Sequence, residues 1–150
     1  MKYKDNKNRC KWCNPQNETY IRYHDEEWGQ PSYEDKYLYE MLILESFQAG
    51  LSWECILNKR EAFREAFDNF DIDKIINYDN NKIHELLENP KIIRNKLKIN
   101  ATINNSKIFK KIQNEYSHDK ECFMYKENEL EENETMTEFG ISEFSNKTIF

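Results

Sequence analysis

Four residues of this sequence have the types and the spacing of a zinc site. His118 and Cys122 lie four positions apart, so a helix would place both side chains on one face. Cys10 and His24, near the beginning of the chain, would complete a set of two sulfurs and two imidazoles, which suits tetrahedral structural zinc. Such a site would tie the start of the chain to its C-terminal part, and it would contribute folding free energy rather than chemistry.

Two other interpretations of these residues stay open on spacing alone. Cys10 and Cys13 form a Cys-x-x-Cys pair, a frequent zinc or redox spacing, so Cys13 could replace one of the four ligands. All four cysteines could instead be ordinary thiols, with His118 a surface residue.

Glu45 is a candidate for ligand recognition. The helical spacing places it on one face with Leu38, Met41 and Leu42, and a buried carboxylate needs partners or a raised pKa. At a helix end it could simply reach water or pair with a lysine. It could also accept hydrogen bonds from a ligand inside an aromatic pocket. The rings that could build this pocket, or pack in an ordinary core, are Trp12, Tyr20, Tyr23 and Trp53.

The composition indicates an all-α fold that would position these residues. The 150 residues suggest one domain, and only three glycines and three prolines among 33% charged residues favour helices over a turn-rich sheet. Residues 10–31 have no clear periodicity, and we predict a packed, aromatic-rich loop region there. Predicted helices run from Ser32, as an N-cap, to Gly50; from Ser52, as an N-cap, through Phe67; and over 71–77 and 81–87. Residues 91–114 are predicted to form one helix or two.

The charge distribution is uneven. A net charge of −6 argues against a nucleic-acid-binding protein, but no acidic residue lies between Glu88 and Glu115. The basic residues of this interval could bind phosphate, or they could form a solvated helix face. They are Lys91, Arg94, Lys96, Lys98, Lys107, Lys110 and Lys111.

The end of the chain differs from the rest in composition. Five glutamates crowd residues 127–134, and like charges at this density disfavour packing. We therefore predict a helical domain over 1–126 and a disordered acidic tail over 127–150. No apolar run is long enough for a membrane span and the first residues do not form a secretory signal, so a cytoplasmic location is expected.

Two strings in the first half of the chain carry a resemblance to a known family. They are Tyr23-His24-Asp25-Glu26-Glu27-Trp28-Gly29 and Glu45-Ser46-Phe47-Gln48-Ala49-Gly50-Leu51-Ser52-Trp53. Together with Arg9-Cys10-Lys11-Trp12 before them and Ile92-Ile93-Arg94-Asn95 after them, they resemble the DNA-3-methyladenine glycosylase I family nearly continuously from Cys10 to Glu115.

The resemblance implies an all-helical fold of the helix-hairpin-helix type and a base-excision repair glycosylase. Such an enzyme flips 3-methyladenine out of double-stranded alkylated DNA and hydrolyses its N-glycosidic bond. By position, Glu45 corresponds to the catalytic-site carboxylate that hydrogen-bonds the base, and Gly50-Leu51 corresponds to the turn that enters the duplex. The pocket residues implied in the same way are Trp12, Tyr20, Tyr23 and Trp53.

The resemblance also implies a structural zinc ion, with Cys10, His24, His118 and Cys122 as its ligands and Cys13 as a bystander. His118 arrives early, however, because the family has several helices and a Gly-Phe-Lys-Phe-Val-Gly hairpin before this histidine. No such string occurs here. We therefore expect a shortened or rearranged member of the family that is active as a monomer and has no membrane partner. The alternative is an inactive, zinc-stabilised remnant or a non-enzymatic binding module.

Overall fold

A computed structural model describes residue 5 and residues 7–116 of the chain, and this part is all-helical. His118, Cys122 and the predicted acidic tail lie outside the described residues, so the domain boundary at residue 126 stays a prediction. The helices are α1 (Glu18–Glu26), α2 (Asp35–Gln48), α3 (Trp53–Leu57), α4 (Arg60–Ala66), the 3-10 turn η1 (Asp68–Phe70), α5 (Ile72–Ile75), α6 (Asn80–Glu88) and α7 (Lys96–Tyr116). None of these helices is both long and apolar enough to cross a bilayer.

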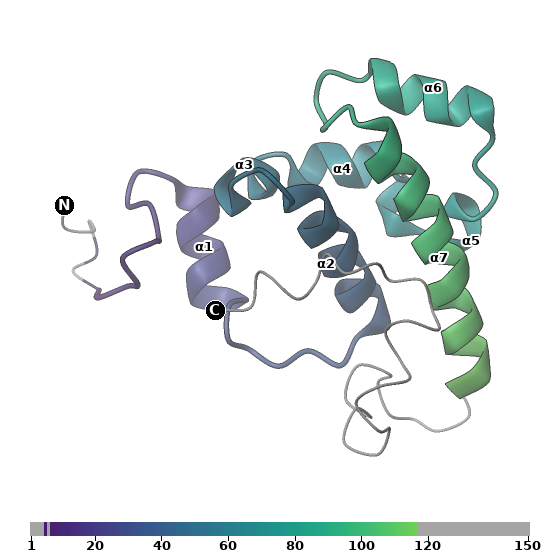
Figure 1. The fold of residues 1–150 in the computed structure, drawn as a ribbon. Helices are drawn as coiled ribbons and strands as arrows, with labels where there is room; N and C mark the ends of the chain where they lie inside the picture. Colours follow the sequence, from purple (N-terminus) through teal and green to yellow (C-terminus); the bar gives the residue numbers. More distant parts are fainter. Residues whose placement is uncertain (1–4, 6, 117–150) are drawn as a thin grey trace.

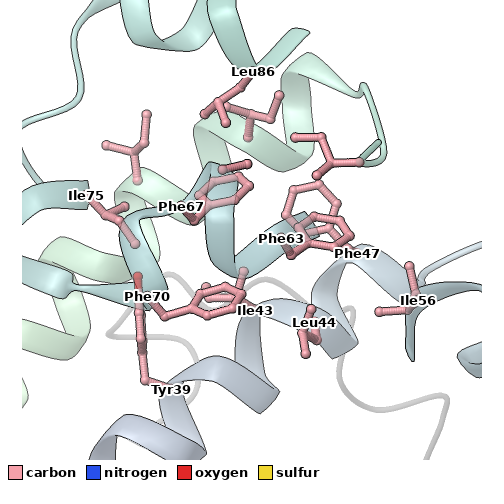
Figure 2. Packing of buried hydrophobic residues seen from close by; sticks show 14 of the residues in the cluster. Tyr39, Ile43, Leu44, Phe47, Ile56, Phe63, Phe67, Phe70, Ile75 and Leu86 are labelled. Carbon is pink, nitrogen blue, oxygen red and sulfur yellow. The ribbon is translucent and has the colours of Figure 1, made fainter. Parts of the chain in front are cut away.

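The core lies where α2, α4 and α7 meet (Figure 1). Tyr39, Ile43 and Phe47 repeat every four residues along α2, so they share one face, and all three are fully buried. The ring of Phe47 packs 4.7 Å from the ring of Phe63 of α4, and Figure 2 shows the aromatic cluster that continues from these two rings. Burial of this cluster supplies the main driving force for the fold.

Polar groups inside the core are paired. The Tyr39 hydroxyl lies 2.5 Å from the Ser106 hydroxyl, and Ser106 donates to the carbonyl oxygen of Thr102 on the same helix at 2.6 Å. Thr102 in turn donates to the Lys98 carbonyl oxygen at 2.9 Å. These bonds offset the cost of removing three hydroxyl groups from water.

A buried ion network joins α1, α2 and α4. The Arg60 guanidinium donates to Glu40 of α2 at 2.8 Å and to Glu27 after α1 at 2.8 Å, and Arg64 donates to the same Glu40 at 2.7 Å. Burial would raise the pKa of Glu40, but the hydrogen bonds from Arg64 and Arg60 outweigh it and hold this pKa below its usual range. The network therefore fixes α1 against α2, the two helices that carry Tyr23 and Glu45.

Four sequence predictions about the helices are wrong. Residues 91–95 are not helical and α7 begins at Lys96, although the predicted last helix began at residue 91. Residues 18–26 form α1, capped by the Asn17 side chain, although we expected an irregular segment. The helix expected from Ser32 begins at Asp35, because Ser32 accepts only a long 3.5 Å bond from Glu34 and does not cap. The single helix expected through Phe67 is broken between α3 and α4. The Ser52 cap is confirmed, since its hydroxyl accepts from the Cys55 N–H at 3.1 Å.

Candidate functional site

Glu45 lies in the last turn of α2 and has no hydrogen-bond or ion-pair partner among the described residues. Its side chain is open to solvent, as expected if a glutamate at this helix end reaches water. Surrounding protein nevertheless desolvates the carboxyl enough to raise its pKa. A carboxylate that is both accessible and partly desolvated can be approached by a cationic ligand.

Tyr23 of α1 and Trp53, the first residue of α3, form a ring pair beside this carboxylate. Their centroids lie 5.5 Å apart in a T-shaped arrangement with an interplanar angle of 65°. Burial raises the pKa of the Tyr23 hydroxyl, and the Glu45 carboxylate raises it further, so the two side chains are electrostatic neighbours. Trp53 Nε1 is buried and makes no hydrogen bond of full geometry within the described residues, but it lies close enough to the Tyr23 hydroxyl to lower the pKa of that group in part. The structure thus brings an unpaired carboxylate, a tyrosine and an indole N–H together.

Trp12 and Tyr20 belong to a second ring group. Trp12 lies 5.2 Å from Tyr20, 5.1 Å from His24 and 5.3 Å from Trp28, centroid to centroid. Tyr20 is buried beneath these rings, whereas Trp12 is 39% exposed. Of the predicted pocket residues, only Tyr20 and Tyr23 share an element, α1, and this helix is the connection between the two ring groups. Trp28, which belongs to the aromatic-rich segment over residues 10–31, joins this ring group although it was not predicted as a pocket residue.

Glu54 anchors the segment that carries Trp12. One of its carboxylate oxygens accepts hydrogen bonds from the side-chain amides of Asn14 and Asn17, both at 2.8 Å. Asn17 also caps α1, because its side-chain oxygen accepts from the Tyr20 N–H at 3.2 Å. The residue after Trp53 therefore holds the loop of Trp12 and the start of α1 in place.

The Gly50-Leu51 turn projects between α2 and α3. Gly50 has a φ of +80°, a left-handed conformation that strains other residues, and the adjacent Leu51 is 40% exposed. Lys98 of α7 braces this turn, since its ammonium group donates to the carbonyl oxygens of Phe47 at 2.8 Å and Ala49 at 2.6 Å. An exposed apolar tip on a braced turn is suited to insertion into a partner.

Two of the predicted zinc ligands lie together. The backbone N–H of Cys10 donates to Nε2 of His24 at 3.2 Å, and Nδ1 of His24 lies 2.9 Å from the Asp25 carboxylate. A carboxylate on one ring nitrogen fixes the tautomer in which the other nitrogen has a lone pair. In this structure the Nε2 lone pair accepts the Cys10 N–H, so a metal bound there would replace that hydrogen bond. Cys13 is buried, and its thiol faces the Tyr20 carbonyl oxygen at 3.9 Å. Within the described residues there is no group of three or more potential metal ligands.

The basic residues between Glu88 and Glu115 do not form one uniform stripe. Lys91 pairs with Glu65 at 3.7 Å, Lys110 pairs with Asp73 at 3.0 Å, and Lys98 is occupied by the carbonyl groups after α2. The remaining four have no ion-pair partner in the part of the chain that the structure describes; they are Arg94, Lys96, Lys107 and Lys111.

The sequence profile of a family described as methyladenine glycosylase matches residues 12–148. The chain belongs to this family. It is 43% identical over 101 residues to the DNA-3-methyladenine glycosylase of Haemophilus influenzae, and equally so to DNA-3-methyladenine glycosylase 1 of Escherichia coli. Each match covers 67% of this chain and 54% of the relative, so the chain spans about half the length of the curated relatives it matches.

Solved structures of the same family share its helical architecture. A crystal structure of 3-methyladenine DNA glycosylase I superposes with a TM-score of 0.71 at 40% sequence identity, over 77% of this chain and 61% of the other. A tyrosine-to-phenylalanine variant of such a glycosylase, in complex with 3-methyladenine, superposes with a TM-score of 0.66 at 38% identity, over 68% of this chain and 55% of the other. The predicted all-α fold and the predicted family are therefore confirmed.

Proposed function

We propose that this chain is a base-excision repair glycosylase that releases 3-methyladenine from alkylated double-stranded DNA. The observation that carries the proposal is Glu45, a carboxylate without a partner among the described residues, next to Tyr23 and Trp53. Family membership and the relative in complex with 3-methyladenine support the same substrate.

The chemistry of this site favours a cationic base. 3-Methyladenine in DNA carries a positive charge, so the carboxylate of Glu45 and the faces of Tyr23 and Trp53 would bind it better than neutral adenine. Because the glycosidic bond of this cationic base is already weak, binding and distortion can drive hydrolysis without a strong nucleophile.

The substrate must leave the base stack before it reaches Glu45. The exposed side chain of Leu51, on the turn directly after α2, would fill the gap that the flipped nucleotide leaves. Glu45 lies six residues before Leu51. The last turn of α2 would therefore recognise the base, and the turn that follows it would fill the gap.

We also propose the structural zinc site of Cys10, His24, His118 and Cys122. The contact between Cys10 and His24, with Asp25 on the second ring nitrogen, supports the first two ligands. Metal analysis of protein purified without chelator tests this site, and absence of zinc would contradict it. Location in the cytoplasm and action as a monomer remain part of the same proposal.

The proposed activity is tested by measuring the release of free 3-methyladenine from methylated duplex DNA by the purified protein. We expect release by the wild type and its loss in Glu45→Gln, which keeps the shape of the side chain. Glu61→Gln is the matched control, because Glu61 is an exposed carboxylate on α4. A folded, zinc-bound wild-type protein that releases no base would contradict the activity and favour the inactive member or binding module.

A further inference from the structure

The start of α7 lies against the residue before the Gly50-Leu51 turn. Lys98, in the first turn of this helix, donates a hydrogen bond from its ammonium group to the Ala49 carbonyl oxygen at 2.6 Å. The loop before α7, residues 89–95, is held separately, because the Lys59 ammonium group donates to the Lys91 carbonyl oxygen at 3.1 Å. Arg94 and Lys96 lie four and two residues before the lysine that contacts this turn.

Arg94 and Lys96 are the two free cations on this loop and at the adjoining helix start. Both side chains are exposed, and neither has an ion-pair partner within the described residues. No acidic residue lies between Glu88 and Glu115, so the sequence around Arg94 and Lys96 carries no negative side chain. Two unpaired cations on a fixed support form a surface complementary to an anion.

Other cations of the same region differ in this respect. Lys91 and Lys110 are paired with Glu65 and Asp73, so part of their charge is already compensated. Lys107 and Lys111 are unpaired, but a helix rise of about 1.5 Å per residue places Lys107 roughly 16 Å along α7 from Lys96. These two lysines provide equal charge far from the turn.

We propose that Arg94 and Lys96 bind the DNA phosphates that flank the nucleotide gap entered by Leu51. This inference rests on the proposed function and names two of the residues through which the chain would hold the DNA backbone. A duplex presents a phosphate row on each side of any point where an apolar side chain enters it, so cations beside the entering turn are placed to meet that row. The complementary charge selects DNA backbone as the occupant of this surface.

The test compares two double variants of equal charge by their salt dependence. Wild type, Arg94→Ala/Lys96→Ala and Lys107→Ala/Lys111→Ala are titrated against a duplex containing an abasic-site analogue over a series of salt concentrations. Each lost phosphate contact lowers the slope of log affinity against log salt by roughly 1, so Arg94→Ala/Lys96→Ala should lower it by about 2. Lys107→Ala/Lys111→Ala should keep the wild-type slope. An unchanged slope in the first variant, or equal reductions in both, would overturn the inference.

Binding of free 3-methyladenine and thermal unfolding are measured on the same variants. The affinity for the base and the melting temperature of Arg94→Ala/Lys96→Ala should equal those of the wild type, because the surroundings of Glu45 and the core are unchanged. A lower base affinity or a lower melting temperature would contradict a role limited to contact with DNA phosphates. If the wild type binds the duplex with the expected slopes but releases no base, the proposed activity fails while this surface stands. If it releases base and the slopes are unchanged, only this surface fails.

Discussion

Glu40 and Glu45 lie on the same helix and have opposite environments. Glu40 is 7% exposed and accepts hydrogen bonds from two arginines, which hold its pKa low. Glu45 is open to solvent, has no partner among the described residues, and desolvation raises its pKa. Glu40 therefore makes its interactions within the fold, whereas Glu45 is left available to a ligand. Matched substitutions at the two positions can test this difference.

The largest expected effect is on stability at Glu40. Glu40→Gln removes the charge that Arg60 and Arg64 share inside the network, and breaking a buried ion pair costs about 3 kcal/mol or more. Urea denaturation should show this loss in the free energy of unfolding, whereas Glu45→Gln should change it by less than about 0.5 kcal/mol. Equal losses of unfolding free energy in Glu40→Gln and Glu45→Gln would contradict the different environments of the two carboxylates.

The reverse ranking is expected for ligand binding. Glu45→Gln removes the charge from a hydrogen bond to the base, and bonds to charged groups contribute about 1.5–3 kcal/mol, so affinity for 3-methyladenine should fall roughly tenfold to a hundredfold. Calorimetric titration of the free base measures this change; the free base is neutral near pH 7, so the charge lost from the hydrogen bond is that of the Glu45 carboxylate. Unaltered affinity in a folded Glu45→Gln protein would show that the carboxylate does not contact the base.

A smaller effect is expected at Gly50. Gly50→Ala forces a side chain into the left-handed conformation at φ +80°, although no atom lies within 4 Å of the added carbon, so only conformational strain of about 1 kcal/mol is expected. Denaturant unfolding checks the value. Ser46→Ala in α2 is the control, because it leaves the turn conformation unchanged. If Gly50→Ala weakens duplex binding, Ser46→Ala should not.

The smallest expected effect is the pH dependence of stability. The lowered pKa of Glu40 means that its stabilisation is present above the unfolded value near 4.5 and is lost as pH falls through the folded pKa. The raised pKa of Glu45 gives the opposite sign: its contribution is present below 4.5 and is lost as pH rises through the folded pKa. The difference in unfolding free energy between wild type and each glutamine variant, measured from pH 3 to 8, should slope in opposite directions. Parallel slopes would contradict the two assignments.

Much of the fold could be predicted from the sequence, because strong signals mark most helices. The Ser52 cap and the Asp71 cap are local chemistry, and both are observed. Helix α1 escaped prediction because it is only nine residues long and its apolar side consists largely of tyrosines, and the Asn17 cap that starts it is stabilised by Glu54, distant in sequence. The break between α3 and α4 likewise depends on tertiary contacts, since it lets Arg60 reach Glu40.

Only part of the candidate site could be predicted, again because some of its features depend on residues distant in the sequence. Family resemblance identified Glu45, Tyr23 and Trp53, and the structure places Tyr23 against Trp53 and within the electrostatic influence of Glu45. Periodicity alone placed Glu45 in an apolar wall, and it could not reveal that Glu40 is the carboxylate that the core encloses. Which of two glutamates on one helix is paired depends on arginines twenty or more positions away, and no local pattern encodes this.

The two hydrogen bonds of Lys98 have a mechanical consequence. Because one ammonium group holds the carbonyl oxygens of Phe47 and Ala49, the start of α7 and the end of α2 are joined by a brace that resists sliding of one helix past the other. The proposed base-binding carboxylate, on α2, and the proposed phosphate-binding cations, at the start of α7, would therefore lie on two elements that are joined directly. A force that bound DNA exerted on one of these elements would be transmitted to the other through this contact.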